Sequence, residues 1–246
     1  MDLREYQTLY SLEENYWWFV GQRCVVEKFL TSLGASSPHL LDVGCGTGIN
    51  LVLLGKYGHA QGVDYAHEAV EFCSQRGLKI VQGNALSLPF KEGMFDAVTA
   101  LGVFYHKAIT DDVVAMKEVY RVLKHGGKFL QLDPAMMCLW GKHDLAFHGV
   151  RRYSRKELIS KFVFAGFTVE RCRYINTAIF PFVWMVRRLG WFSSAKPTSD
   201  VQPMNSILNW ILTKWYCFEV RLAWYVPLPF GVNVFAVGRK GSGKGK

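Results

Sequence analysis

The most informative stretch of this sequence is Leu40-Leu41-Asp42-Val43-Gly44-Cys45-Gly46-Thr47-Gly48, where an apolar run passes directly into a glycine-rich turn. The run predicts a buried strand over residues 39–43, and the pattern after the turn predicts a helix over residues 50–57. Glycines let the backbone approach a ligand closely, and the first turn of a helix offers free N–H groups. The stretch therefore predicts a strand–turn–helix unit that binds a ligand at the turn.

Outside this unit, strand-like and helix-like patterns alternate along the chain. We expect further strands over residues 60–64, 78–81, 95–101, 128–132, 167–174 and 232–237, and helices over 68–76, 111–123 and 154–165. This alternation is typical of a mostly parallel sheet with helices on both faces. The sequence therefore predicts a Rossmann-like, doubly wound α/β fold with a seven-stranded sheet and an antiparallel last strand.

The length of 246 residues suits a single domain with one large insertion. Residues 1–36 predict an N-terminal helical cover, and residues 37–175 predict the core that binds the ligand. Residues 176–230 separate the last two strands, where a hairpin of about 2–5 residues is usual, and predict a helical insertion. We expect the last strand within 231–240 and a disordered tail over 241–246.

A carboxylate lies at the distance expected of a nucleoside site. Asp64 ends the predicted strand 60–64 and follows Gly44 by 20 residues, the spacing at which an acid binds ribose hydroxyls in dinucleotide sites. The glycines are spaced as GxGxG, and Ile49 lies where a dinucleotide fingerprint needs a small residue. The pattern therefore favours a nucleoside that carries an amino-acid arm over a dinucleotide.

Further motifs follow in the order found in one enzyme superfamily. Residues 42–48 resemble motif I of the class I S-adenosylmethionine-dependent methyltransferases, and residues 62–64, 83–86, 95–98 and 118–127 resemble its later segments. The resemblance implies S-adenosyl-L-methionine as cofactor and S-adenosyl-L-homocysteine as product. The residues that it places at the cofactor are Asp42, Gly44, Cys45, Gly46, Gly48, Asp64, Tyr65, Asn84, Ala85, Leu86 and Leu101.

The resemblance also assigns a role to the N-terminal cover. In similar methyltransferases an N-terminal helix covers the cofactor, so Trp18 is expected near the sulfonium and Arg23 at the methionine carboxylate. The alternative is a helix that only packs on the sheet. The chain departs from the family at Asn84, where Asp is usual, and at Tyr105, where relatives carry a Glu.

Titratable side chains cluster after the predicted strand 128–132, at the edge where strands open toward the ligand. The candidate catalytic residues are His143, His148, Asp144 and Tyr153, with a histidine as the base because histidine titrates near neutral pH. The alternative is a loop held by ordinary hydrogen bonds. No metal site is predicted, since the two histidines lie five residues apart, off the spacing of helical zinc pairs.

The basic excess of the chain lies in its C-terminal part. The net charge is +9, with 13 Lys and Arg against 16 Asp and Glu in residues 1–150, and 16 against 4 in residues 151–246. Five of the eight tryptophans lie in 176–230. We therefore expect the insertion to cover the acceptor as a lid and to touch an amphiphile or an anionic membrane surface. The alternative is that these aromatics complete the core or a dimer interface.

We expect a methyltransferase that acts on a small-molecule or lipid-linked acceptor by in-line methyl transfer, as a monomer or a homodimer. One alternative is an RNA methyltransferase, although no N/D-P-P-Y motif follows the predicted strand 95–101, and nucleic acid is not the expected partner. The other is a non-catalytic membrane-surface module that retains the cofactor fold. The intact glycine turn argues against this module.

The six cysteines form no CxxC pair, and their scatter indicates reduced, mostly buried thiols. The start of the chain has no basic region followed by an apolar one, and the apolar run over 175–186 is too short to span a bilayer. These features predict a cytoplasmic protein that is peripheral on a membrane surface.

Overall fold

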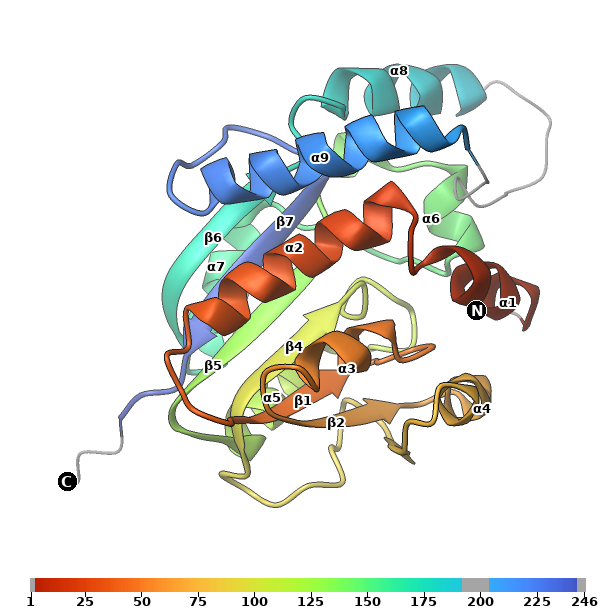
Figure 1. Cartoon of the computed structure of the whole chain (residues 1–246). Coiled ribbons are helices and arrows are strands. Elements are labelled where there is room, and N and C mark those ends of the chain that lie inside the picture. Colours follow the sequence, from red (N-terminus) through yellow and green to blue (C-terminus); the bar gives the residue numbers. More distant parts are fainter. Residues whose placement is uncertain (1–2, 192–203, 243–246) are drawn as a thin grey trace.

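A computed structural model describes residues 3–191 and 204–242 of the chain. Its sheet has the strand order β3-β2-β1-β4-β5-β7-β6 (Figure 1). The strands are β1 (His39–Val43), β2 (His59–Asp64), β3 (Ile80–Gln82), β4 (Phe95–Leu101), β5 (Leu123–Pro134), β6 (Thr168–Ile175) and β7 (Asn233–Arg239). The strands β1 to β5 pair in parallel, whereas β7 lies antiparallel between β5 and β6. The predicted fold class is confirmed.

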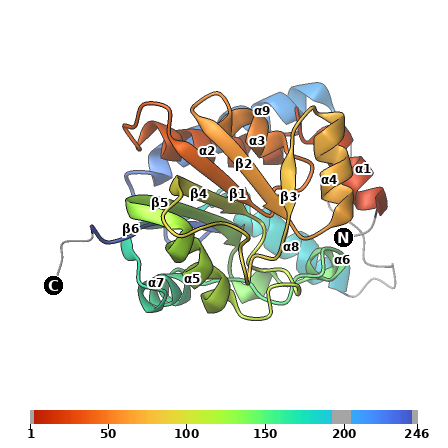
Figure 2. The ribbon, with the colours of Figure 1, turned by 90° about the horizontal axis from the view of Figure 1, so that it is seen from below.

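Helices cover both faces of this sheet (Figure 2). One face carries α2 (Trp17–Thr31), α3 (Ile49–Leu54) and α9 (Ser206–Ala223), and the other carries α5 (Asp112–Val122) and α7 (Arg155–Phe164). Alternate strand residues enter two separate cores, as in β4, where Ala97 packs under the first set of helices and Val98 under the second. Burial on both faces is the reason why the strands read as continuous apolar runs.

Of the remaining helices, α4 (His67–Gln75) packs on β2 and β3, which it connects. α1 (Leu3–Leu12) packs on α4, while η1 (Met137–Leu139) and α6 (Lys142–Ala146) follow β5. α8 (Phe180–Trp191) contacts η1 and α6. Both the N-terminal helical cover and the helical insertion are therefore present. The sequence also predicts an exposed loop over 196–203; this segment and most of the tail expected over 241–246 lie outside the described residues.

The insertion is fastened to the cover through α9 and α2. The ring of Tyr216 lies directly over Gly21, where a Cβ atom would sit 1.9 Å from the ring, so only glycine allows this approach. A disulfide joins Cys24 of α2 to Cys217 of α9. The expectation of reduced thiols throughout is therefore wrong for this pair, because the two helices bring together cysteines 193 residues apart.

One strand boundary differs from the prediction for a local reason, whereas a helix start agrees with it. The strand expected over 128–132 begins five residues earlier, since Leu123 already pairs with Phe95 before a register shift. α7 begins as expected after Ser154, whose hydroxyl accepts a hydrogen bond of 3.2 Å from the N–H of Glu157.

Candidate functional site

A cavity of about 860 Å³ opens at the carboxyl ends of β1, β2 and β4. Its walls come from α1 and α2, from the glycine turn, from the segments after β2, β3, β4 and β5, and from α6. Ligands of open α/β sheets bind at this edge. The volume lies near the upper end of the range of about 300–1,000 Å³ for small-ligand sites, so it can hold two small molecules side by side.

The glycine turn and Asp64 form one hydrogen-bonded unit at the floor of the cavity. One carboxylate oxygen of Asp64 accepts from the N–H of Gly46 at 2.9 Å, and the other accepts from the N–H of Ala66 at 2.9 Å. Burial raises the pKa of Asp64, and these backbone donors oppose that rise. Gly46 has a φ of +54°, and a Cβ atom there would meet nothing within 4 Å. The backbone is therefore open to a ligand at this point.

Asp42 lies beneath the turn and does not line the cavity. It is 1% exposed, and the Thr99 hydroxyl donates to its Oδ1 at 2.6 Å. Burial raises the pKa of Asp42 to about 7. Its Oδ2 has no hydrogen-bond partner among the described residues. A buried polar oxygen without a partner is uncommon in folded proteins.

The other residues expected at the cofactor line the cavity, with one exception. Gly48 caps the start of α3 and faces Leu78 and Cys73 instead. After β3, the side-chain oxygen of Asn84 accepts from the N–H of Leu86 at 2.9 Å, which shapes the turn expected at adenine. The lining includes Trp18, Arg23, Gly44, Cys45, Gly46, Asp64, Tyr65, Asn84, Ala85, Leu86 and Leu101.

The N-terminal cover is locked onto the glycine turn by Glu13, which the sequence analysis missed. Its buried carboxylate accepts from the Thr47 hydroxyl and forms an ion pair of 2.7 Å with Arg76. Arg23 lines the cavity and donates to the backbone oxygens of Glu13 and Glu14 at 2.7 and 2.5 Å. The guanidinium of Arg23 therefore holds the connection between α1 and α2 beside the cavity.

On the side away from the glycine turn, two histidines line the cavity. His143 comes from α6, with its ring 4.7 Å from that of Phe147. His106, which was not predicted, follows β4. Burial lowers the pKa of His106 to about 4, and the N–H of Ala108 donates to its Nδ1 at 3.1 Å. The neutral ring then carries its proton on Nε2, so His106 is a hydrogen-bond donor at neutral pH.

The remaining candidate catalytic residues do not line the cavity. Asp144 is 1% exposed and forms ion pairs with Arg152 at 2.8 Å and Arg187 at 3.1 Å. The ring of His148 lies edge-on against that of His106, 5.9 Å between centroids. The structure thus brings only His143 of the four to the cavity.

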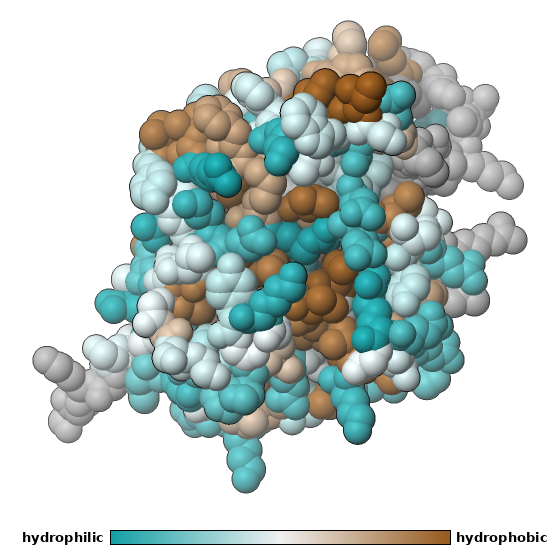
Figure 3. Space-filling view, viewed as in Figure 1, coloured by the Kyte–Doolittle hydropathy of each residue, from teal (hydrophilic) through white to brown (hydrophobic). Residues whose placement is uncertain are grey.

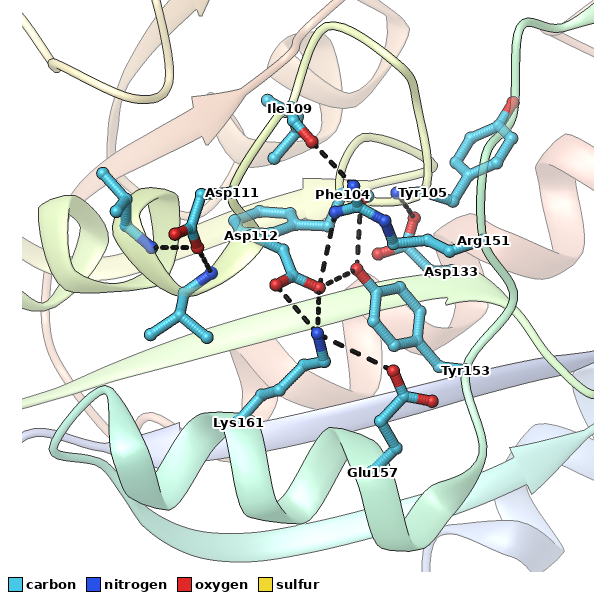
Figure 4. Close-up of polar contacts among 12 residues, drawn as sticks. Phe104, Tyr105, Ile109, Asp111, Asp112, Asp133, Arg151, Tyr153, Glu157 and Lys161 are labelled. Atoms are coloured by element: carbon cyan, nitrogen blue, oxygen red, sulfur yellow. Dashed lines mark hydrogen bonds and ion pairs between the residues drawn. The ribbon is translucent and has the colours of Figure 1, made fainter.

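Tyr153 belongs to a buried polar cluster (Figure 4). Its hydroxyl donates to Asp112 at 2.8 Å and lies 3.0 Å from the backbone oxygen of Phe104. Lys161 pairs with the same carboxylate at 2.8 Å, and Arg151 at 3.4 Å. Burial raises the pKa of Tyr153 far above its usual range. This cluster joins α5, α7 and the segment after β4, and its role is structural.

The lid expected from the insertion is not seen in the described residues. None of the side chains from 176–189 and 204–230 lines the cavity. Trp184, Trp210 and Trp215 are exposed, while Trp224 is buried against Phe235. Arg187 bonds to the backbone oxygen of Leu139 and to Asp144 and is not part of the cavity lining. The side chain of Trp191 lies outside the described residues.

Neither a membrane-spanning helix nor a metal site is found within residues 3–191 and 204–242. No helix there is long and apolar enough to cross a membrane. No group of three His, Cys, Asp or Glu side chains there is placed to hold a metal ion.

Known proteins match one part of the chain. Residues 41–131 match the family described as Methyltransferase domain. The chain is 37% identical over 108 residues to a demethylmenaquinone methyltransferase of Staphylococcus aureus, which covers 40% of this chain and 44% of that protein. It is also 37% identical over 90 residues to a mouse protein named probable tRNA methyltransferase 9B, covering 36% of this chain and 20% of that protein. The matches therefore span less than half of these relatives.

Solved structures show the same fold over nearly the whole chain. A methyltransferase from Thermotoga maritima superposes with a TM-score of 0.59 at 18% identity, covering 97% of this chain and 96% of the other. Geranyl diphosphate C-methyltransferase from Streptomyces coelicolor, solved with geranyl diphosphate and S-adenosyl-L-homocysteine, gives 0.56 at 16% identity, with 87% and 77% covered. The chain thus shares the fold of S-adenosylmethionine-dependent methyltransferases, and its residues 41–131 match a methyltransferase domain.

Replacing Gly46 with alanine should lower the affinity for S-adenosylhomocysteine at least about tenfold, which is about 1.4 kcal/mol. The added methyl group meets no protein atom, so it would project into space that the cofactor needs. Gly77→Ala is a matched control, because Gly77 has a φ of +72°, equally open surroundings and no place in the cavity lining. Both variants should lose about 1–2 kcal/mol of stability. Equal calorimetric affinities for the two variants would contradict a cofactor at this turn.

Proposed function

We propose that this protein transfers a methyl group from S-adenosylmethionine to a small-molecule or lipid-linked acceptor. One observation carries the proposal: a single cavity joins the glycine turn and Asp64 to a second compartment that is lined by His106, His143 and Phe147. An acceptor placed in that compartment would lie beside a cofactor held at the turn. Holding two reactants in one cavity contributes about 7–11 kcal/mol to such a reaction.

The residues of the cavity fit this cofactor. Asp64 offers carboxylate oxygens where ribose hydroxyls can donate, and the backbone of Gly46 is open to a ligand beside it. Bound S-adenosylmethionine would supply a methyl group activated by its sulfonium. In the second compartment, His143 is positioned to accept the proton of the acceptor, and the Nε2–H of His106 to donate to an acceptor oxygen.

A compact acceptor is favoured over RNA by the state of the basic residues. Three of the 16 basic residues in 151–246 are paired inside the protein: Arg152 and Arg187 with Asp144, and Lys161 with Asp112. RNA-binding surfaces instead present clustered free cations. The menaquinone-related relative acts on a small molecule by its name, which is in line with this choice. The tRNA-related relative keeps RNA as the second candidate, to be tested alongside.

We also propose a cytoplasmic location at the membrane surface. The Cys24–Cys217 disulfide does not favour the cytoplasm, since such bonds are rare in reducing compartments. The proposal rests instead on the hypothesis that the cofactor is a cytosolic metabolite. Finding the protein in an oxidising compartment by cell fractionation would overturn it.

Substituting His143 with asparagine should slow methyl transfer about 10²–10⁴-fold, because the base that accepts the acceptor proton is lost. Affinity for S-adenosylhomocysteine should stay unchanged, since the turn and Asp64 are untouched. The measurement uses labelled S-adenosylmethionine with lipid extract, polar extract and total RNA as separate acceptor pools. His148→Asn is the matched control, because His148 lies nearby but outside the cavity lining. Label in RNA alone, or equal rates for both variants, would contradict the proposal.

A further inference from the structure

The outward sides of α8 and α9 carry large apolar side chains in contact with solvent. Phe182 and Leu189 on α8 are 64% and 67% exposed, and Ile207 and Trp210 on α9 are 70% and 60% exposed. In the space-filling view, hydrophobic residues gather along the upper edge over these helices (Figure 3). We call this the α8–α9 surface and define it by Phe182, Leu189, Ile207, Trp210, Trp215 and Phe218.

Folding of the domain does not account for this surface. α9 buries one side against α2 through Tyr216, Val220 and Ala223, so its opposite side should be polar in a protein surrounded by water. That side instead carries Trp210 and Phe218. Large apolar side chains that gather on one part of a protein surface often mark a site of contact with a partner or a membrane. The surface is therefore suited to a partner.

The charges on these helices indicate the chemistry of that partner. Within residues 178–191 and 204–226 the only carboxylate is Glu219, which is buried and accepts from the N–H of Thr177 at 2.6 Å. The cations Arg188, Lys214 and Arg221 are exposed beside the apolar side chains. Lys214 lies 6.0 Å from the centre of the Trp210 ring, and Arg188 lies 5.7 Å from that of Trp184.

Tryptophan beside lysine and arginine, without exposed acids, is the composition that the headgroup region of an anionic bilayer attracts. A second copy of the chain suits it less well. In a two-fold symmetric contact between two α9 helices, Lys214 and Arg221 would approach their own counterparts without an acid to compensate them.

Both helices are also connected to the walls of the cavity. Arg187 of α8 bonds to Asp144 of α6, the helix that places His143 in the lining. On α9, Asn209 accepts from the N–H of Trp17 at 2.8 Å, and the next residue, Trp18, lines the cavity. Figures 1 and 2 place α8 and α9 at the same end of the molecule, with α9 on the side of α2 and α8 on the side of α6.

We infer that the α8–α9 surface docks the protein on an anionic lipid bilayer, with both helices lying in the interface and neither crossing it. The evidence for docking comes from α8 and α9 alone. The consequence of docking, that an amphiphilic acceptor passes from the bilayer to the cavity between them, rests on the proposed function.

The test is co-sedimentation of the full chain with phosphatidylcholine vesicles that contain about one third phosphatidylglycerol, and with vesicles of phosphatidylcholine alone. We expect binding to the anionic vesicles that weakens with salt. Lys214→Gln with Arg221→Gln should reduce the partition coefficient about 30-fold, from about 1 kcal/mol for each cation. Lys56→Gln with Lys91→Gln, two exposed cations on other elements, is the matched control and should change it little.

The apolar contribution is tested by Trp210→Gln with Phe218→Gln, which should also reduce the partition coefficient at least about tenfold. Absence of binding to anionic vesicles, or equal binding by all three double variants, would overturn the inference. So would sedimentation of the wild type as a dimer that Trp210→Gln dissociates, since a second copy would then occupy the surface. Calorimetry with S-adenosylhomocysteine separates the two proposals: vesicle binding without cofactor binding removes the proposed function and leaves the docking.

Discussion

Replacing Asp64 with alanine should weaken the binding of S-adenosylhomocysteine about 100-fold or more. One or two charge-assisted hydrogen bonds to ribose hydroxyls disappear, each worth about 1.5–3 kcal/mol. The same change removes the acceptor of the Gly46 N–H, which lies 2.9 Å from the carboxylate, so the turn also loses its support. The affinity of Asp64→Asn should lie between that of the wild type and that of Asp64→Ala, because the amide oxygen can still accept one of these bonds. The measurement is titration calorimetry.

Asp96→Ala supplies the control for the loss of a carboxylate. Asp96 accepts from the N–H of His39 at 2.8 Å and from Lys124 at 2.7 Å, and it is not part of the cavity lining. Its removal should leave the cofactor affinity unchanged. Undiminished affinity in a folded Asp64→Ala protein would mean that the ribose does not lie at this acid.

The second large effect concerns stability. Asp144→Asn should lower the free energy of unfolding by about 3–5 kcal/mol, because it leaves the guanidinium of Arg152 buried without its counter-charge. The two side chains are 1% and 2% exposed and 2.8 Å apart, so water screens the pair very little. Urea denaturation measures the change. Glu157→Gln, which alters an exposed pair with Lys161 at 3.7 Å, should cost less than about 1 kcal/mol.

The same variant decides what Asp144 does. If Asp144 only holds α6, the folded fraction of Asp144→Asn at low temperature should turn over substrate with an intact pH profile. A stable variant without activity would instead show that the carboxylate takes part in the chemistry, as the sequence analysis suggested.

The cofactor side of the site could be predicted from the sequence because its parts are local. The glycine turn, Asp64 and the segment after β3 each follow directly from a strand end, so their positions are fixed once the strands are known. Only Asp42 and Gly48 fall outside the lining, and both lie within a few residues of it. Resemblance to a known superfamily added the identity of the ligand, which spacing alone could not supply.

The acceptor side could not be predicted in the same way. The density of titratable groups after β5 suggested a catalytic loop. Asp144 is instead held in an ion pair, and Tyr153 in a hydrogen bond, with side chains from other elements. Arg187 and Asp112 lie 43 and 41 residues away from these two, and no local pattern reveals such pairs. Glu13 was missed for the same reason, because it acts through Arg76, 63 residues later.

The position of β7 also decides when the sheet can be completed. β7 lies between β5 and β6 and pairs with both over its whole length. Leu132 therefore gains its partner Phe235, and Tyr174 its partner Val234, only once β7 is in place. On the ribosome, β1 to β5 can assemble early, but β6 has no neighbour until residues 233–239 have emerged. Until then, two open strand edges are exposed to mispairing with other chains. The nascent protein is therefore expected to need chaperone protection longest at the edges of β5 and β6. The sheet is complete only when its final strand, β7, has been synthesised.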